Sequence, residues 1–492
     1  MNNTQITALI IILLYMLATV AIGLLSSRNE AKKSNDDFLM ASKSLGPIVL
    51  AGTLFAANTG GASTTGIATN VYQYGLSASW YVIAAGIGFI LVSFIAPYFR
   101  RASANTVPQI VSMRYGKASH IFTAFTSIAA LFMATGAQII ATASIISVVT
   151  GLSFNIAAIV TTIVVIAYTM IGGFKSVASA NASANIMHVL FITIGMSTAM
   201  LIMVNNPAVG GFSALFDKAR TVTDTAGTNL DLLSMTKIGL PAIIGYIAMY
   251  YMTFPTGQEI VQTFCSAKDG RSAKIGSVIA GLISAAYAIV PAIIGLIAYT
   301  CINGYTAGGA QKNALAEATI QFAPSIVAGL VLAAIVAATM SSASGNMIGT
   351  ATMFTNDVFR PYVNKGVKDD SKEVWVSRVT MVVVGAVGLL ISLTASNIIS
   401  VMMTAFTLRS AGPFAAFICG LFYKNVTKHA GFISIVTGTV VAAIWIYALK
   451  NPWGLSAIVP GGVAAFIAIF LVSAIERSLG VEAAKPIKFE DE

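Results

Sequence analysis

The sequence predicts an all-α polytopic membrane protein with thirteen transmembrane helices. Hydrophobic residues make up 57% and charged residues 9% of its 492 positions, against roughly 45–50% and about 25% in soluble domains. A helix needs about 20 apolar residues to cross the roughly 30 Å hydrocarbon core of a bilayer. Apolar runs near that length cover residues 5–26, 46–70, 75–99, 118–150, 152–171, 182–205, 235–266, 272–302, 322–355, 375–395, 398–423, 429–449 and 452–476.

The Lys and Arg residues predict the orientation of these spans, because cytoplasmic loops are enriched in both. With the N-terminus outside, one side of the membrane holds 22 of the 28 Lys and Arg residues and the other holds five, while Arg409 lies inside a span. We therefore expect a multi-pass protein of the plasma (inner) membrane, with its N-terminus outside and its C-terminus in the cytoplasm. The net charge of +10 fits contact with anionic membrane lipid and does not indicate a nucleic-acid partner.

Two predicted spans are interrupted at corresponding places. Gly60-Gly61, with Asn58 and Thr59, interrupt the second span, and Thr253-Phe254-Pro255-Thr256-Gly257 interrupt the seventh. Gly and Pro weaken a helix and free backbone carbonyls. Each interruption opens a set of five spans, and a unit with an odd number of spans inverts when it is repeated. Paired broken helices indicate a transporter binding site at the membrane midplane, although kinks without such a role are the alternative.

The two sets of five spans, the loop between them and the segments on either side give five parts of the chain. We predict inverted repeats at 46–205 and 235–423, with an extracellular loop at 206–234 between them. An extra transmembrane helix and a cytoplasmic linker (1–45) precede the repeats, and two further helices with a short cytoplasmic tail (424–492) follow them.

The sequence disfavours an enzyme. The cysteines Cys265, Cys301 and Cys419 lie far apart and the three histidines are scattered, so neither a disulfide framework nor a metal cluster is predicted. The predicted spans contain no His cluster, metal-ligand spacing or Ser/His/Asp set. A membrane sensor or structural protein with the same fold stays open as an alternative, although no hydrophilic stretch is long enough for an output domain.

The segment from Ile335 to Asp357 places hydroxyls and small residues inside an apolar stretch of membrane length. Polar groups in hydrocarbon usually face a protein interior or an ion path. On a helix, Ala338, Ser341 and Ser342 stand at i, i+3 and i+4, so a carbonyl and two hydroxyls can converge on one hard cation. We interpret this face as half of a sodium site, with close helix packing through small residues as the alternative.

A series of short motifs resembles those of a known family. The motifs are Asp37-Phe38-Leu39-Met40-Ala41-Ser42-Lys43-Ser44-Leu45-Gly46, Ala56-Ala57-Asn58, Tyr74-Gly75-Leu76, Gly172-Gly173-Phe174-Lys175-Ser176-Val177, Phe354-Thr355-Asn356-Asp357 and Gly420-Leu421-Phe422-Tyr423-Lys424. Because these motifs occur in this order in a chain with thirteen predicted spans, the chain resembles the sodium:solute symporter family. That family includes transporters of proline, pantothenate, sialic acid and sugars. The resemblance implies a LeuT-type fold with a five-plus-five inverted repeat.

The resemblance also implies the ligands of a shared sodium site. Backbone carbonyls of Ala56 and Thr59 would face the carbonyl of Ala338 and the hydroxyls of Ser341 and Ser342. Sodium prefers oxygen ligands, and carbonyls can supply them where helical hydrogen bonding is interrupted.

Two positions depart from the family's pattern. Many members have Trp-Thr-Asp after the Gly-Gly motif, where this chain has Ser179-Ala180-Asn181. Some members have a second sodium site, of which Ser344 matches one serine while Gly345 replaces another. We therefore expect one sodium ion per cycle, with Asn181 and Ser344 on a possible sodium path. Coupling to protons stays open, because Asn181 lacks the usual acid.

By position, the family's solute contacts would lie beside this site. We expect them at Asn58, Gly60 and Ser63 in the second span, Thr135 and Gln138 in the fourth, Tyr250, Thr253 and Gln258 in the seventh, and Arg409 in the eleventh. Arg409 could bind a solute carboxylate through its planar guanidinium, although a structural pairing or a carbonyl contact is the commoner role for such a residue. For Glu259 a structural ion pair is favoured. The resemblance argues against sialic acid and sugars, because the family positions that bind these solutes in other members are replaced in this chain. We expect a small polar solute such as an amino acid or betaine, imported with sodium by a monomeric functional unit.

Overall fold

The computed structural model describes residues 1–29, 45–101, 107–167, 169–170, 189–223, 228–302, 313–367, 369–395 and 397–486. Asn181 and most of the motifs at 37–46 and 172–177 lie outside these residues. The described residues are almost entirely helical, and their β-bridges are isolated ones, Leu45 with Ala267 and Thr223 with Asn229. The prediction of an all-α protein is therefore confirmed for this part of the chain.

Most of the described residues belong to α-helices. The α-helices of the first half are α1 (Asn3–Asn29), α3 (Pro47–Asn58), α4 (Ile67–Tyr74), α5 (Trp80–Val92), α6 (Ala96–Arg101), α7 (Val107–Tyr115), α8 (Lys117–Thr150), α10 (Met196–Val204) and α11 (Gly211–Thr221). Those of the second half are α12 (Leu240–Thr253), α13 (Gln258–Cys265), α14 (Gly270–Tyr287), α15 (Ile289–Cys301), α16 (Ala314–Phe322), α17 (Ser325–Met353), α18 (Asp370–Thr394), α19 (Ile398–Ser410), α20 (Pro413–Phe422), α21 (Lys428–Tyr447) and α22 (Ile458–Ser478). Short 3-10 or π segments are η2 (Ala62–Gly66), η3 (Gly75–Ser79), η4 (Leu190–Gly195), η5 (Phe254–Thr256), η6 (Phe354–Val363) and η7 (Pro452–Gly454).

Fewer uninterrupted helices reach membrane length than the thirteen predicted spans. Among the described residues, seven helical segments are long and apolar enough to cross a membrane, or eight if α19 and α20 count as one bent span. Four further apolar helices are shorter, at Asn3–Ala18, Pro47–Asn58, Phe154–Ala167 and Leu190–Val204. Breaks explain part of the difference, because they divide predicted spans into pieces below membrane length. The protein is a polytopic α-helical membrane protein, and the count of thirteen remains a prediction.

Both predicted interruptions are present in the structure. Helix α3 ends at Asn58, and Thr59 has extended backbone angles (φ −97°, ψ 92°) before the π-helical segment η2 begins. Helix α12 ends at Thr253, η5 contains Pro255, and Gly257 is extended (φ −89°, ψ 120°) before α13 begins. Proline lacks the N–H needed for a helical hydrogen bond, so the chain leaves the helix at this place.

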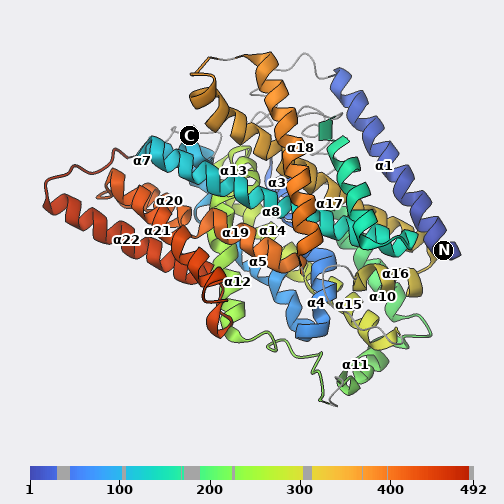
Figure 1. Cartoon of the computed structure of the whole chain (residues 1–492). Coiled ribbons are helices and arrows are strands. Elements are labelled where there is room, and N and C mark those ends of the chain that lie inside the picture. The colour runs from blue at the N-terminus through green and yellow to red at the C-terminus, as the bar shows by residue number, and fades with distance from the viewer. Residues whose placement is uncertain are drawn as a thin grey trace.

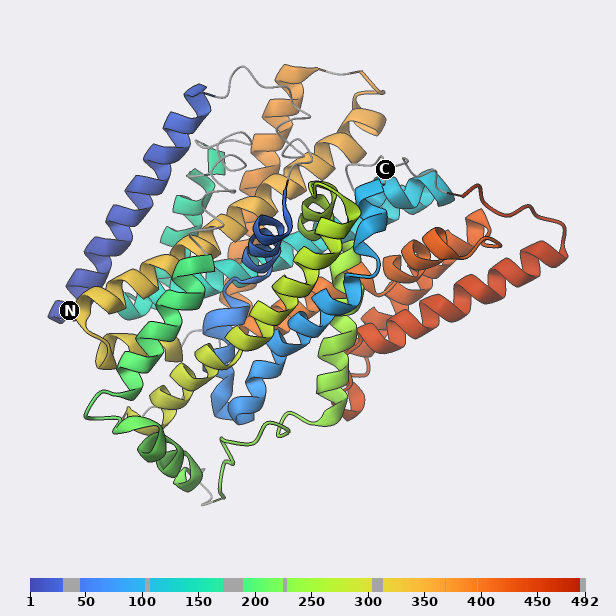
Figure 2. The ribbon, with the colours of Figure 1, turned by 180° about the vertical axis from the view of Figure 1, so that it is seen from behind.

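Helix α8 runs through the middle of the bundle, where it packs against α17, α18 and α19 (Figure 1). Helix α1 packs on α17 at one edge of the molecule, and α21 pairs with α22 at the opposite edge (Figures 1 and 2). Helix α14 packs against α3 and α5. Its Gly281 lies so close to α5 that an added Cβ would come within 2.6 Å of the Gly86 carbonyl oxygen. Small residues thus allow close helix packing where hydrophobicity cannot drive association.

The eleventh predicted span is bent by 43° between α19 and α20. The bend falls at Ala411 and Gly412, directly before Pro413, the first residue of α20. A Cβ on Gly412 would lie 2.0 Å from the carbonyl oxygen of Ile435 in α21. Only glycine fits this close approach, so the bend is held against a neighbouring helix.

Candidate functional site

The break in the second span is held by side chains that replace the missing helical hydrogen bonds. The Gln138 side-chain oxygen accepts a hydrogen bond from the Gly61 N–H over 3.0 Å. The Ser63 hydroxyl accepts from the Gly60 N–H at 2.9 Å. A Cβ on Gly60 would lie 2.8 Å from Nε2 of Gln138, so the backbone and this amide are in direct contact. The structure therefore brings together three predicted solute contacts, Gly60, Ser63 and Gln138.

The same break lies beside α17, the helix that carries the predicted sodium hydroxyls. A Cβ on Gly61 would lie 2.2 Å from the Cβ of Ala141 in α8 and 3.4 Å from Cγ2 of Thr339 in α17. The hydroxyls of Thr142 and Thr339 are 2.6 Å apart and join the two helices. Sequence reasoning missed Thr339, although it precedes Ser342 by three residues and so lies on the same helix face.

The five predicted sodium ligands lie on two elements. At the end of α3, the N–H of Thr59 donates to the carbonyls of Phe55 and Ala56, at 2.9 and 3.3 Å. On α17, Ala338 is buried, Ser342 is partly buried and Ser341 is exposed. Neither serine hydroxyl has a side-chain hydrogen bond to another described residue, whereas that of Thr339 donates within its own helix. Both serine hydroxyls can therefore accept a ligand, and the complete five-oxygen site remains a prediction.

Two buried polar atoms near these elements have no hydrogen-bond partner in the described part of the chain. They are Nδ2 of Asn58, at the end of α3, and Oγ of Ser344, which is fully buried in α17. A buried polar group without a partner costs free energy, so each of these positions suits a bound water, ion or solute group. Asn58 was predicted as a solute contact and Ser344 as part of a sodium path.

At the seventh span, the predicted contacts face the eleventh span and an aromatic cluster. Thr253 Oγ1 lies 2.9 Å from the Ser410 hydroxyl, and the Thr256 hydroxyl donates to that of Ser410 at 3.0 Å. The Tyr250 ring packs against Tyr81, with ring centroids 5.5 Å apart. Both Tyr250 and Thr253 are buried. These contacts tie the broken seventh span to α19.

Two other predicted contacts are engaged elsewhere. The methyl group of Thr135 lies against α18, where a Cβ on Gly388 would be 3.1 Å from it, and its hydroxyl donates to the Leu131 carbonyl. The Gln258 side-chain oxygen accepts from the Val107 N–H at 3.1 Å, at the start of α7. Neither residue is joined to the second-span break by these bonds.

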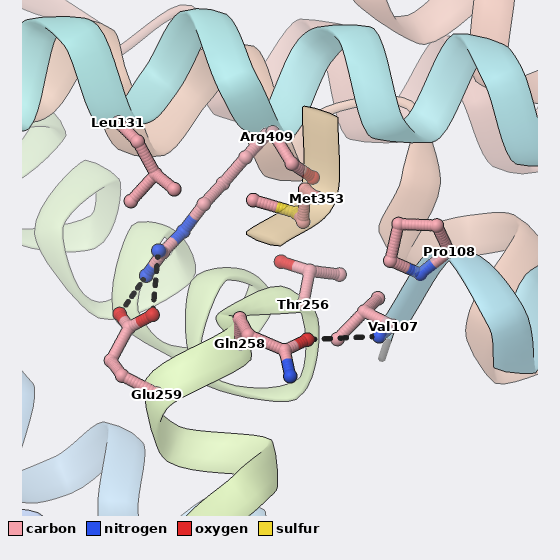
Figure 3. Close-up of a pocket in the computed structure, with 9 residues that line it drawn as sticks. Val107, Pro108, Leu131, Thr256, Gln258, Glu259, Met353 and Arg409 are labelled. Carbon is pink, nitrogen blue, oxygen red and sulfur yellow. Dashed lines mark hydrogen bonds and ion pairs between the residues drawn. The ribbon is translucent and has the colours of Figure 1, made fainter. Parts of the chain in front are cut away.

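Arg409 and Glu259 form a bidentate ion pair (Figure 3). Nη2 of Arg409 donates to Oε1 of Glu259 at 2.8 Å, and Nη1 donates to Oε2 at 3.2 Å. The structural ion pair favoured for Glu259 is present, with Arg409 as its partner. The guanidinium that was predicted to bind a solute carboxylate already binds a carboxylate of the protein.

The pair lies at a small pocket formed where several helices meet. Its lining residues are Val107, Pro108, Ser127, Leu131, Thr256, Gln258, Glu259, Met353 and Arg409. The space open to the centre of a water molecule is about 10 Å³, which is room for about one water. This conformation therefore leaves no space for an organic solute there.

The last acid of the Phe354–Asp357 motif also has a partner that sequence reasoning missed. Asp357 in η6 is 2% exposed, and its Oδ1 lies 3.0 Å from Nε2 of His120, near the start of α8. This contact joins the ends of α8 and α17. Because the two residues are 237 positions apart, no local pattern could have indicated it.

Together, the helical bundle, the two broken spans and the polar side chains packed at the breaks are typical of a membrane transporter. Solved structures share this fold. A Na+-coupled sialic acid symporter in a substrate-bound outward-open state has a TM-score of 0.76, with 17% identity over 98% of this chain and 99% of its own. A nucleobase-cation-symport-1 family transporter in a closed conformation has a TM-score of 0.57, with 15% identity over 89% and 94%. The fold is therefore LeuT-like.

The sequence comparisons identify the family. The profile of the sodium:solute symporter family matches residues 38–438, and the chain belongs to this family. An osmoregulated proline transporter of Bacillus subtilis (strain 168) is 25% identical over 500 residues, 94% of each chain. A sodium/glucose cotransporter of Vibrio parahaemolyticus is 25% identical over 86% of this chain and 82% of its own. A sodium/proline symporter of Escherichia coli (strain K12) is 25% identical over 94% and 92%.

Family membership confirms the resemblance drawn from the motifs. The chain is a multi-pass transporter of a small solute with sodium as the coupling ion, and it is not an enzyme.

Proposed function

We propose that this protein imports a small polar organic solute, such as an amino acid or betaine, by sodium-driven symport with alternating access. The observation that carries the proposal is the contact between the second-span break and α17, where Gly61 lies against Thr339 within one helical turn of Ser341 and Ser342. Carbonyls at the break and hydroxyls of α17 would supply oxygen ligands of the kind that sodium prefers.

The proposed sodium ligands are the carbonyls of Ala56, Thr59 and Ala338 and the hydroxyls of Ser341 and Ser342. Sodium binding would hold α3 against α17 and shape the solute site around Asn58, Gly60, Ser63 and Gln138. A ligand can shift a conformational equilibrium only through different affinity for the two states. Sodium would meet this condition because its ligands come from two elements that can separate.

The proposed arrangement has thirteen spans, two inverted repeats of five, the N-terminus outside and the C-terminus in the cytoplasm. The Lys and Arg distribution supports this orientation. The two described breaks, one in the second span and one in the seventh, support the repeats.

One sodium ion per cycle is sufficient for accumulation. A tenfold sodium gradient supplies about 1.4 kcal/mol, and a potential of about 100 mV supplies about 2.3 kcal/mol per charge. Together, about 3.7 kcal/mol supports roughly several-hundred-fold accumulation of a neutral solute.

The test is uptake into proteoliposomes that contain the purified protein. Radiolabelled proline, glycine betaine and glucose are offered with an inward gradient of sodium, or of protons without sodium. We expect saturable, sodium-dependent uptake of proline or betaine. Uptake driven equally well by protons alone would refute sodium coupling, and the absence of uptake of every solute that stabilises the protein would favour a sensor.

The assigned ligands are tested by the double substitution Ser341→Ala and Ser342→Ala. The half-saturating sodium concentration should rise about tenfold or more, which corresponds to about 1.4 kcal/mol of sodium binding. Ser325→Ala is the matched control, because Ser325 begins the same helix and its hydroxyl pairs with Thr4. Unchanged sodium activation in the double variant would remove these serines from the site.

A further inference from the structure

The ion pair between Arg409 and Glu259 joins α19, before its bend, to α13, after the break of the seventh span. Arg409 is the second-last residue of α19, just before the 43° bend. Glu259 is the second residue of α13, just after the seventh-span break. Both line the small pocket that α7, α8 and α17 also border (Figure 3). The pair therefore lies where the proposed sodium helix and the seventh-span break approach each other.

Arg409 is buried more deeply than its partner. The Arg409 side chain is 7% exposed, whereas that of Glu259 is 40% exposed. The guanidinium also lies over the Phe406 ring, 5.0 Å from its centroid. A Cβ on Gly257 would lie 2.6 Å from Nη2 of Arg409, so the guanidinium rests directly on the backbone of the break.

Glu259 does not accept hydrogen bonds from all the N–H groups of the Arg409 guanidinium. Nη1 and Nη2 donate to the carboxylate, while the buried Nε has no partner in the described residues. An arginine side chain stays protonated in proteins, and a buried charge without a counter-charge is strongly unfavourable. If the carboxylate were removed, Arg409 would therefore gain strongly from binding another anion at the same place.

We propose that Glu259 determines the charge selectivity of the transport path. Its carboxylate neutralises the positive charge of Arg409 at the seventh-span break. The wild-type path therefore does not attract anions, and the transported solute is one without net charge. In the absence of the Glu259 carboxylate, Arg409 becomes a binding site for a small carboxylate. This inference rests on the proposed function for its transport consequence, but the anion site itself can be tested without transport.

The test is a thermal unfolding titration of the purified full-length protein with potassium acetate, using acetamide as the neutral analogue and no sodium. We expect acetate to raise the unfolding temperature of Glu259→Ala by several degrees with saturation, because alanine leaves the place of the carboxylate open, while acetamide has no effect. The wild type and the double variant Glu259→Ala/Arg409→Gln should not respond. Because the double variant has the same carboxylate removed, it separates binding at Arg409 from a general effect of the salt.

Loss of folding in Glu259→Ala is itself informative. Acetate present during extraction should restore folded Glu259→Ala protein, because the truncation leaves room for the anion next to Arg409. A Glu259→Ala protein that stays unfolded with acetate, or that folds and does not respond to acetate, would overturn the proposal. An equal response of the double variant would also overturn it.

The transport consequence is tested with solutes of different charge. Wild-type proteoliposomes should take up the zwitterions proline or glycine betaine, but not the anion lactate, in a sodium gradient. Sodium-dependent lactate uptake by the wild type would overturn the assignment of charge selectivity. If no solute were taken up in a sodium-dependent way, the proposed function would be refuted. The acetate titration would still test the anion site at Arg409 independently.

Discussion

The side-chain oxygen of Gln138 accepts a hydrogen bond from the backbone N–H of Gly61 over 3.0 Å, and this bond holds α8 against the break of the second span. Gln138 is 5% exposed, so water cannot readily replace the bond. A single side chain thus compensates for a hydrogen bond that the helix loses where it unwinds.

Gln138→Met should destabilise the protein by about 1–3 kcal/mol, the cost of a buried donor without an acceptor. Methionine has a similar shape but provides only a weak acceptor. Thermal unfolding of the purified protein measures the effect. Ile139→Met introduces the same residue at the next position of α8 and serves as the control. Equal unfolding temperatures for the two variants would show that the Gln138 bond contributes nothing.

Gly61→Ala should separate the break from α8, because its Cβ would lie 2.2 Å from the Cβ of Ala141. Overpacking of this kind typically costs about 1–3 kcal/mol, and we expect sodium-dependent uptake to fall with it. Gly345→Ala adds the same methyl group to α17, where nothing lies within 4 Å. That control should keep its stability, since alanine favours a helix over glycine. Normal uptake by Gly61→Ala would argue against close packing of the break during transport.

Features that depend only on neighbouring residues could be predicted from the sequence. Gly60 and Gly61 indicated one break and Pro255 and Gly257 the other, because their backbone properties act without help from the rest of the fold. Apolar composition likewise indicated a helical membrane protein. Helix lengths were less predictable, since hydropathy does not show where a span unwinds or bends. The eleventh span bends at Gly412, which lies against α21, and nothing in the neighbouring sequence identifies that partner.

The site was predictable only as a set of residue types. Arg409 and Glu259 each stood out as a charge within or near a span, but their pairing connects residues 150 positions apart. Thr142 and Thr339 likewise meet through the packing of α8 on α17. Thr135 has the polarity expected of a solute contact, yet its position on α8 directs its methyl group toward α18. Side-chain direction and long-range pairing come from tertiary packing, which a single sequence does not show.

Removing either member of the Arg409–Glu259 pair should have unequal effects. Glu259→Gln leaves a deeply buried guanidinium without its counter-charge, whereas Arg409→Gln leaves a carboxylate that is 40% exposed and can be hydrated. We therefore expect Glu259→Gln to lower the unfolding temperature more than Arg409→Gln does.

A double-mutant cycle over these two residues should give a coupling energy of about 0.5–3 kcal/mol. The matched control is a cycle over Asp217 and Arg220, whose side chains are 67% and 69% exposed. Exposed pairs contribute about 0–1 kcal/mol, so this second cycle should show little coupling. A larger drop for Arg409→Gln than for Glu259→Gln would contradict the asymmetry in burial.

Asp269 should make the stability of α14 depend on pH. Its carboxylate accepts a hydrogen bond from the Ser272 N–H at 2.6 Å and caps the helix. Hydrogen bonds from the backbone and side chain of Ser272 hold the pKa of Asp269 below its ordinary value. A lowered native pKa means that the stabilisation is fully present above the unfolded pKa of about 3.9. It is lost as the pH falls from about 4 through the native pKa.

Asp269→Asn and Asp269→Ala separate the charge from the cap. Asparagine also caps helices well, so Asp269→Asn should unfold close to the wild-type temperature at pH 7 and lose less stability than the wild type below about pH 4. Asp269→Ala should be less stable at both pH values, because the Ser272 N–H then has no side-chain acceptor. Unfolding temperatures in detergent at pH 7 and pH 3.5 measure both effects, with Asp217→Asn as an exposed control. A parallel pH response of the wild type and Asp269→Asn would show that this carboxylate does not control the acid sensitivity.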